Sequence, residues 1–332
     1  MHRILVTGGT GFIGRALAGR LRDEAGTLRI LTRKATAAPP GCEAVLASLD
    51  DEASLRAACS GADILYHLAG HAHVTNRHAA GEAELHRRIN FEATCRLYRV
   101  AAQTGLRRFV FVSSVKAGGE SAMRCLDENS DLLPDDPYGQ AKRRAEDWLL
   151  EQARAGGPEV VIIRPTLVYG PGVKGNLAAM LRWIDRGIFP PVPETGNRRS
   201  MVDVRDLVEA LLAAGSRPEA VGQIYIISDS EDYSTRRIYE AMCRALGRRP
   251  LPGLPAALLR GLGRIGDLLE GVLRRPLPYN GATASRLLDS ACYRSVRAER
   301  LLGFRPRYRL EDALPQMVAT YRGATSASAG VD

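Results

Sequence analysis

The sequence has no closely spaced pair of cysteines. Its cysteines are scattered along 332 residues, at Cys42, Cys59, Cys95, Cys125, Cys243 and Cys292. The absence of a C-x-x-C pair excludes the metal and redox motifs that are built on that spacing. Several of these cysteines lie in apolar helical patterns, where a thiol packs as a small hydrophobic group. We therefore expect buried free thiols in a reducing compartment, which predicts a cytoplasmic protein.

Long hydrophobic runs and clustered basic residues are also missing. No stretch of about 18 uninterrupted apolar residues occurs, so the sequence predicts no transmembrane segment. The amino terminus enters the first predicted strand directly and leaves no room for a signal peptide. The net charge of +9 comes mainly from arginines spread over the whole length, with no lysine-rich tail. This pattern favours a solvated basic surface, or a positive site for an anionic substrate, over a nucleic-acid partner.

Three glycines lie where a predicted strand meets a predicted helix. The stretch 7–14 reads Thr-Gly-Gly-Thr-Gly-Phe-Ile-Gly and follows the apolar run 4–6. After it, Ile13, Leu17 and Leu21 recur at the spacing of one helix face. Glycine permits a tight turn, close approach of a pyrophosphate, and packing of the helix on the strand. The spacing G-x-x-G-x-x-G at this position therefore predicts a dinucleotide site at the helix N-terminus.

Strands and helices alternate along the first half of the chain. Predicted strands at 28–32, 44–46, 63–70, 108–114 and 160–163 are separated by helical patterns at 54–59, 82–103 and 137–155. This order predicts an α/β fold with a doubly wound parallel sheet, a Rossmann fold. After Pro165 turns become frequent and helices dominate, apart from a strand at 223–228. Helices are expected at 177–186, 205–214, 235–246, 255–273, 296–302 and 310–321.

The change of pattern also predicts domain boundaries. We expect an NAD(P)-binding Rossmann domain over residues 1–165, with a later strand and helix near 200–228 returning to it. Residues 166–199 and 229–322 are expected to form a smaller, mostly helical C-terminal substrate-binding domain. Residues 323–332 are small and polar, which predicts a flexible tail.

A tyrosine, a lysine and a serine form a candidate acid–base site. Tyr138 and Lys142 are four residues apart on one predicted helix, so they share a face. A nearby ammonium favours phenolate and would lower the phenol pKa from its usual value of about 10. Ser114 falls at the carboxyl end of a predicted parallel strand, where ligands bind. Its hydroxyl would hold a substrate oxygen against Tyr138.

With these motifs in view, the chain resembles the extended short-chain dehydrogenase/reductases, the NAD-dependent epimerase/dehydratase family. The resemblance rests on the glycine turn and on the stretches Tyr66-His-Leu-Ala-Gly70, Phe109-Val-Phe-Val-Ser-Ser114, Tyr138-x-x-x-Lys142 and Arg164-Pro-Thr-Leu-Val-Tyr-Gly-Pro-Gly172. It implies that Ser114, Tyr138 and Lys142 are catalytic. The expected cofactor-binding residues are Gly8, Gly11, Phe12, Ile13, Gly14, Arg33, Leu68, Ala69, Tyr138 and Lys142.

The choice between NAD and NADP depends on the end of the second predicted strand. This strand ends at Arg33-Lys34, without an acidic residue. An acidic residue there would bond the ribose 2′-hydroxyl of NAD, whereas an arginine accommodates the 2′-phosphate of NADP. We expect NAD or NADP, with a preference for NADP, unless Arg33 is simply a solvated loop residue. The family often has Asp at an adenine-contacting position near Ser48, where this chain has Ser-Leu.

Within the family, the closest resemblance is to nucleotide-sugar C4 epimerases and 4-keto-sugar reductases. The substrate-binding residues that it implies are His73, Lys116, Glu120, Asn176, Arg199 and Arg286. Arginine suits the oxygens of a nucleotide diphosphate. The alternatives are a helix N-cap for Asn176 and solvent-exposed charges for the arginines. Leu167 stands where many epimerases carry a substrate-binding Asn, which favours the reductase branch.

The predicted function is therefore an NAD(P)-dependent oxidoreduction at C4 of a nucleotide-linked sugar, with Tyr138 as general acid/base. The apolar, arginine-bearing stretch 254–273 keeps open a 3β-hydroxysteroid-dehydrogenase-like enzyme on a hydrophobic alcohol or ketone. That stretch would rest on a membrane surface or pack over the substrate domain. A non-catalytic NAD(P)-binding sensor is the third interpretation, but it would need only the glycine turn.

Two expectations concern bound partners. His71 and His73 have no acidic or cysteine partner at metal-site spacing, so we expect no metal. Dimers are common in the resembled family, and the helices after the fourth and fifth predicted strands would pair across a two-fold axis in a homodimer.

Overall fold

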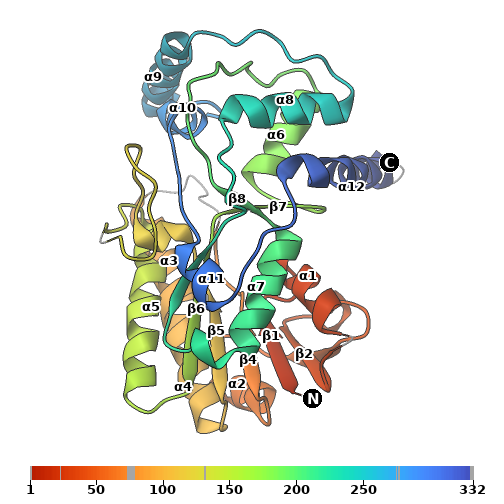
Figure 1. Ribbon diagram of the computed structural model, residues 1–332, viewed down its shortest axis with the longest axis vertical. Helices are drawn as coiled ribbons and strands as arrows, with labels where there is room; N and C mark the ends of the chain where they lie inside the picture. Colours follow the sequence, from red (N-terminus) through yellow and green to blue (C-terminus); the bar gives the residue numbers. More distant parts are fainter. Residues whose placement is uncertain are drawn as a thin grey trace.

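A seven-stranded parallel sheet forms the centre of the fold. The computed structural model describes residues 2–22, 24–72, 79–130, 132–273, 275 and 277–329, with only the backbone described at 79–80 and 324–329. Its main sheet has the order β3-β2-β1-β4-β5-β6-β9 (Figure 1). The strands are β1 (Arg3–Thr7), β2 (Thr27–Thr32), β3 (Glu43–Leu46), β4 (Ile64–His67), β5 (Arg108–Val112), β6 (Glu159–Pro165) and β9 (Ile224–Ile227). The predicted doubly wound sheet is confirmed.

Helices cover both faces of this sheet, because its strands are apolar on both sides. In β1, Val6 packs in one core with α1 (Phe12–Leu21) and α7 (Val204–Ser216). The preceding residue, Leu5, belongs to the opposite core. The helices of that second core are α2 (Glu52–Cys59), α4 (Ala93–Gln103) and α5 (Pro137–Arg154). The strand order reverses between β1 and β4. Open α/β sheets bind ligands at such a point, in a crevice outside the carboxyl ends of the strands.

A second, mostly helical part lies beyond the carboxyl ends of the strands (Figure 1). It has its own hydrophobic core, which includes Leu181, Met242 and Leu314. Its elements are β7 (Leu167–Tyr169), α6 (Asn176–Asp185), β8 (Met201–Asp203), α8 (Thr235–Leu246), α9 (Ala256–Leu273), α10 (Gly281–Leu288) and α12 (Leu310–Ala329). The short helix α11 (Val296–Leu301) packs back on β9.

Several elements differ from the expected pattern. The short pair β7 and β8, and the helix α10, were not expected from the sequence. The expected helix 82–103 is three segments, α3 (Ala79–His86), the π-helical turn η2 (Arg87–Glu92) and α4. Helix α12 continues to Ala329, beyond the expected start of a tail at 323. Short 3₁₀ turns lie between these elements, at η1 (Ala35–Ala37), η3 (Val115–Gly118) and η4 (Pro218–Ala220).

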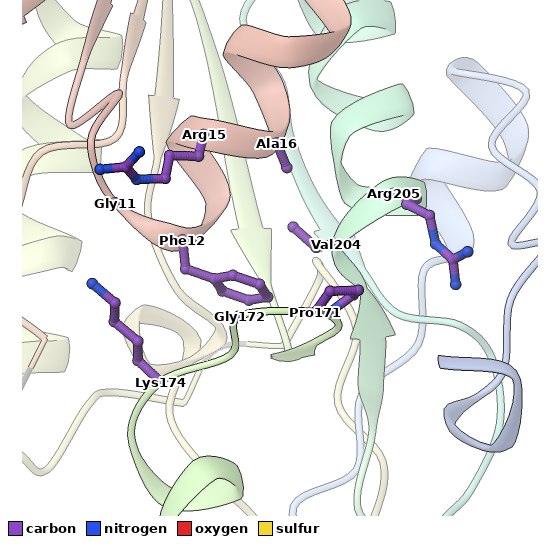
Figure 2. A pocket seen from close by; sticks show the side chains of 9 residues that line it. All are labelled: Gly11, Phe12, Arg15, Ala16, Pro171, Gly172, Lys174, Val204 and Arg205. Carbon is purple, nitrogen blue, oxygen red and sulfur yellow. The ribbon is translucent and has the colours of Figure 1, made fainter. Parts of the chain in front are cut away.

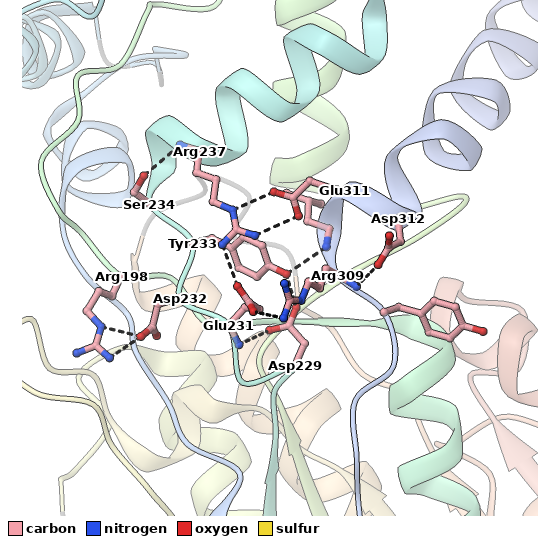
Figure 3. A network of polar contacts seen from close by, with 12 residues as sticks. Arg198, Asp229, Glu231, Asp232, Tyr233, Ser234, Arg237, Arg309, Glu311 and Asp312 are labelled. Atoms are coloured by element: carbon pink, nitrogen blue, oxygen red, sulfur yellow. Dashed lines mark hydrogen bonds and ion pairs between the residues drawn. The ribbon is translucent and has the colours of Figure 1, made fainter.

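A polar network ties the turn after β9 to α8 and α12 (Figure 3). Arg237, in the first turn of α8, bonds Glu231 at 3.0 Å and Glu311 of α12 at 2.9 Å. The hydroxyl of Tyr233 donates to Asp229 at 2.7 Å. Burial raises the pKa of Asp229 to about 6, although this hydrogen bond opposes the shift. The network therefore anchors the helical part to the last strand of the sheet.

Two cysteines correct the expectation of free thiols. Cys125 and Cys292 form a disulfide, with their Cα atoms 4.4 Å apart and 167 residues between them in sequence. Backbone hydrogen bonds on both sides of Leu126, to Cys292 at 2.9 Å and from Arg294 at 2.8 Å, pair the two segments. This long-range pairing leaves no trace in cysteine spacing. The remaining cysteines are free, at Cys42, Cys59, Cys95 and Cys243.

A fully buried ion pair joins β6 to α5. Arg164 donates through Nε to Glu146 Oε1 at 2.9 Å and through Nη2 to Oε2 at 2.5 Å. Their side chains are 3% and 0% exposed. Such a pair is costly to bury, and removal of one partner leaves an uncompensated charge in the core.

We predict that Glu146→Leu or Arg164→Met alone lowers the free energy of unfolding by about 3–5 kcal/mol, because each leaves one charge buried and unpaired. The double variant is expected to recover most of that loss. Chemical denaturation of all three variants measures these values. Asp147→Asn is the matched control, since it breaks the exposed pair with Arg143 on the same helix and should cost at most about 1 kcal/mol. Single variants as stable as this control would contradict the prediction.

We also predict that the native protein carries the Cys125–Cys292 cross-link. Non-reducing peptide mapping by mass spectrometry should detect one linked peptide pair. Cys292→Ser should destabilise the oxidised protein by about 2–4 kcal/mol, because the unfolded chain loses its constraint. The difference should disappear when both proteins are unfolded in dithiothreitol. Detection of six free thiols in the denatured, unreduced protein would overturn this assignment.

Candidate functional site

The glycine turn between β1 and α1 has the geometry of a phosphate cradle. Gly8 has φ +72°, and a Cβ there would lie 2.6 Å from Ala69 N. A Cβ on Gly14 would lie 2.2 Å from Gly8 O. No side chain caps the start of α1 at Gly11, so its first N–H groups face the crevice. The turn therefore fits the pyrophosphate of a dinucleotide, since backbone N–H groups can approach it closely.

The segment after β4 lies against this turn. Leu68 N donates to Thr7 O at 3.1 Å, and Ala69 N donates to Thr7 Oγ1 at 3.3 Å. The same Thr7 hydroxyl bonds His67 Nδ1 at 2.6 Å, while His67 Nε2 bonds Thr94 at 3.0 Å. Burial lowers the pKa of His67 to about 3, so the ring is neutral and structural. Leu68 and Ala69 are thereby held beside Gly8, at the edge of the expected cofactor site.

Asn90 belongs to the candidate site and was not predicted from the sequence. It lies buried in the π-helical turn η2, a kind of irregularity that is frequent at functional sites. Its amide bonds the backbone of His71 in both directions, at 2.8 Å and 2.9 Å. At Gly70 a Cβ would lie 2.8 Å from Asn90 Oδ1 and 3.4 Å from Lys142 Nζ. Asn90 therefore holds the segment after β4 next to Lys142. The only feature of the sequence that could have indicated this role is a polar residue on the apolar face of the predicted helix.

Two serines follow β5 at the carboxyl edge of the sheet. Ser113 is 4% exposed, and its Oγ has no hydrogen-bond partner among the described residues. A buried hydroxyl without a partner at this edge is consistent with a site that a cofactor or substrate completes. Ser114 begins the turn η3, where its Oγ accepts from Lys116 N at 3.3 Å. The arrangement therefore supports a ligand at the end of β5.

Tyr138 stands in the first turn of α5, which Asp136 caps by accepting from Gly139 N at 2.8 Å. Its side chain bonds Ser114, which lowers the phenol pKa, but burial dominates and raises that pKa to about 12. The ring of His86 lies 5.6 Å from its ring, edge to face. The structure thus brings Ser114 and Tyr138 together, with the phenol protonated at neutral pH.

Lys142 is buried one turn further along α5. Its Nζ donates to Val112 O at 3.0 Å and lies 4.5 Å from the ring centroid of Phe111. Burial lowers the pKa of Lys142 to about 8. The pKa of Tyr138 is raised rather than lowered as expected, because desolvation of the phenol outweighs its hydrogen bond with Ser114. The ammonium is instead held toward the end of β5.

A cavity of about 400 Å³ lies beside the glycine turn (Figure 2). Phe12 points into it, while Arg15 and Lys174 lie together on one side. Arg205 points away and stacks on Tyr308, 3.4 Å from the ring centroid. The cavity is lined by Gly11, Phe12, Arg15, Ala16, Pro171, Gly172, Lys174, Val204 and Arg205. Most of this lining is apolar, and Arg15 and Lys174 place positive charge on one side of it. Ser114, Tyr138 and Lys142 are not among the lining residues.

Four of the six expected substrate residues gather at one place. Lys116 pairs with Glu120 at 2.5 Å, and the charge of Glu120 acts to raise the pKa of Arg199. Arg199 donates to the backbone oxygen of Arg286 at 3.0 Å, and burial lowers its pKa overall. The cluster therefore joins the turn after β5 to the helical part of the molecule.

The other two predicted substrate residues are not part of this cluster. Asn176 is the exposed first residue of α6, whose N-cap is Gly175. His73 lies outside the described residues. For the cofactor, Arg33 is exposed just after β2.

The chain is similar to known proteins in sequence and in fold. A family model described as the NAD dependent epimerase/dehydratase family matches residues 4–228. The chain is 32% identical over 292 residues to a UDP-glucose 4-epimerase of Vibrio cholerae, covering 84% of this chain and 89% of that protein. It is 26% identical over 346 residues to a 3β-hydroxysteroid dehydrogenase/Δ5→4-isomerase of Mycobacterium tuberculosis, covering 97% and 90%.

A solved structure gives the same fold. The UDP-glucose 4-epimerase of Thermus thermophilus, in complex with NAD, superposes with a TM-score of 0.75 at 23% identity. The match covers 97% of this chain and 99% of that chain. The seven-stranded sheet and the helical part above it are therefore shared over the whole length.

We predict that Gly14→Ala weakens dinucleotide binding. The added Cβ would meet Gly8 O at 2.2 Å, and overpacking of about 1–3 kcal/mol corresponds to roughly a tenfold to hundredfold loss of affinity. Titration with NADH and NADPH, followed by fluorescence, measures the effect. Gly19→Ala is the matched control on the same helix, because a Cβ there meets nothing within 4 Å. Equal affinities of the two variants would show that the turn is not the cradle.

Proposed function

The chain belongs to the NAD dependent epimerase/dehydratase family of extended short-chain dehydrogenase/reductases, and on that premise we propose that it interconverts a hydroxyl and a ketone at C4 of a nucleotide-linked sugar. The observation that carries this proposal is the meeting of Ser114 and Tyr138 beside the buried Lys142, at the edge of the glycine cradle. A binding protein without catalysis would need the cradle but not this group.

A nicotinamide dinucleotide, when bound, would supply or take up the hydride at C4. The backbone of residues 8–14 would hold its pyrophosphate, and Leu68 and Ala69 would lie beside it. Arg33 supports a preference for NADP, because it is exposed just after β2 and a guanidinium suits the 2′-phosphate. Family membership supports a nicotinamide dinucleotide in either case.

Tyr138 is the proposed general acid and base. Its pKa of about 12 keeps the phenol protonated, so it can donate to an alkoxide that forms at C4. In the oxidative direction it must first lose its proton, and a cation nearby makes this less costly. Lys142, one turn further along α5, would be that cation; in this structure its Nζ donates to Val112 O. Ser114 would hold the C4 oxygen against the phenol.

The basic cluster supports a diphosphate on the substrate. Arg199 is buried enough for its pKa to be lowered, so a bound anion would relieve the cost of its desolvation. Arg286 lies near enough to lower that pKa further. Glu120, in turn, is paired with Lys116 and would bind sugar hydroxyls as an acceptor. A nucleotide diphosphate sugar would supply both an anion for the arginines and hydroxyl groups for Glu120. Its phosphates would lie at the arginines and its sugar at Lys116 and Glu120.

Epimerisation and reduction remain two outcomes of the same acid–base group. The 32% identical UDP-glucose 4-epimerase supports epimerisation. Leu167, in place of a polar residue on β7, supports the reductase branch, and so does Arg33. The two reactions differ in whether the cofactor is regenerated within one turnover.

A hydrophobic alcohol or ketone is the second candidate substrate. The relative named as a 3β-hydroxysteroid dehydrogenase covers almost the whole chain and supports this class. An exposed apolar helix, α9, is a second supporting feature. The cluster around Arg199 favours the nucleotide sugar, because a steroid has no charge for it to bind.

We predict that the purified protein converts UDP-glucose to UDP-galactose with catalytic NAD, or reduces a UDP-4-keto-sugar with stoichiometric NADPH. Tyr138→Phe should lower kcat by about 10²–10⁴-fold, because the general acid is lost. NMR spectroscopy of the products measures both reactions. Tyr225→Phe is the control, since its hydroxyl bonds Glu219 O at 3.2 Å, away from the site.

Three outcomes would contradict this proposal. Full activity of Tyr138→Phe would remove its proposed role. Reduction of hydrophobic ketones, without action on any nucleotide sugar, would favour the second candidate. Cofactor binding without turnover of either class would favour a sensor.

A further inference from the structure

Helix α9 carries the largest set of exposed apolar side chains on the described surface. They recur every three or four residues and so form one stripe along the helix. Leu268 and Val272 are 73% and 79% exposed, values unusual for such residues in a packed helix. The α9 stripe consists of Leu258, Leu262, Ile265, Leu268, Leu269, Val272 and Leu273.

A different strip of α9, formed by Leu259, Gly263 and Gly266, is packed against the protein. Leu259 is 0% exposed. At Gly263 a Cβ would lie 3.0 Å from the Cβ of Ala284 in α10. At Gly266 it would lie 2.3 Å from the backbone oxygen of Tyr279. These contacts fix the rotation of α9 and direct the α9 stripe outward.

The acidic residues of α9 are engaged with the chain that follows the helix. Asp267 accepts from Gly281 N at 2.9 Å. Glu270 accepts from Leu277 N at 2.6 Å and from Asn280 at 3.1 Å. Both carboxylates of this fully described helix thus cap the turn that leads to α10.

The arginines near the α9 stripe, in contrast, are exposed to solvent. Arg264, in the middle of α9, and Arg275, after its end, are exposed. Arg260 is half exposed even though it pairs with Asp289. The outer face of α9 is therefore apolar with a basic border.

We propose that α9 docks on the surface of an anionic lipid bilayer. An amphipathic helix with leucines on one face and arginines at its border suits the interface between acyl chains and acidic headgroups. At 18 residues the helix would lie in the interface plane over about 27 Å. Figure 1 places α9 at the end of the molecule beside α10, apart from the main sheet, where a flat surface can reach it.

The charges favour a bilayer over a second copy of the chain. A symmetric pairing of two α9 stripes would bring the same arginine border together from both copies, which is repulsive. The carboxylates that could have balanced it are used within each copy. No helix among the described residues is long and apolar enough to cross a membrane. The proposed docking is peripheral because α9 would lie in the plane of the interface. It does not depend on the proposed function.

The test is flotation of the full-length protein with vesicles. One vesicle preparation contains phosphatidylcholine alone, and the other contains equal parts of phosphatidylcholine and phosphatidylglycerol. We expect the protein to bind the anionic vesicles. Binding should fall by about tenfold or more in a triple variant with Leu262→Gln, Ile265→Gln and Leu269→Gln, because three aliphatic side chains that the bilayer would bury are lost. Arg264→Gln should reduce the preference for anionic vesicles.

Matched exposed positions outside α9 provide the control. Leu46, Met123 and Ile188 are also exposed apolar residues, and their triple change to glutamine should leave vesicle binding unaltered. Circular dichroism checks that both triple variants fold. No binding to anionic vesicles, or equal loss in both triple variants, would overturn the proposal. So would a stable dimer, seen by sedimentation velocity, that only the α9 variant dissociates.

Discussion

The buried ion pair between Arg164 and Glu146 supports the parts that carry the candidate acid–base group. Glu146 lies one turn beyond Lys142 on α5, and Arg164 comes from β6. The guanidinium also lies beneath the turn after β5, because a Cβ on Gly118 would be 2.8 Å from Arg164 Nη1. Two charges removed from water are tolerated only in such complete pairing. This contact therefore helps to fix the position of Lys142 relative to Ser114.

Burial shifts the two titrating groups of the site toward their neutral forms. The pKa of Tyr138 is raised to about 12, and that of Lys142 is lowered to about 8. Both shifts have desolvation as their first cause. The site thus disfavours isolated charge until a ligand brings a compensating dipole or ion. This is the electrostatic setting in which a developing alkoxide is most strongly affected by one well-placed proton donor.

The sequence predicted features that depend on local pattern, and it missed those that depend on distant contacts. Strand alternation and the glycine turn specified the sheet, since hydrophobic period and turn chemistry are local. Helix periodicity placed Tyr138 and Lys142 on one face, and a predicted strand end placed Ser114 at the sheet edge, but the grouping of Ser114 with Tyr138 was expected from the resemblance to the family. The Cys125–Cys292 disulfide joins segments 167 residues apart, so the spacing of the cysteines in the sequence does not predict it. The π-helical turn that holds Asn90 changes the hydrogen-bond register without changing the composition of the helix, so the sequence pattern does not predict it. The direction of the Tyr138 pKa shift was predicted wrongly, because the spacing of Tyr138 and Lys142 does not show how deeply the phenol is buried.

Helix α10 links the candidate substrate site with the exposed surface of α9. Its Arg286 backbone oxygen accepts from Arg199 at 3.0 Å, and its Ala284 packs on Gly263 of α9. Two helices that pack closely through small residues move together, because protein interiors are densely packed. The proposed phosphate site and the α9 stripe are therefore opposite sides of one rigid unit. The substitutions proposed on the α9 stripe replace none of the residues of the proposed phosphate site, so any effect they have on that site would have to pass through α10.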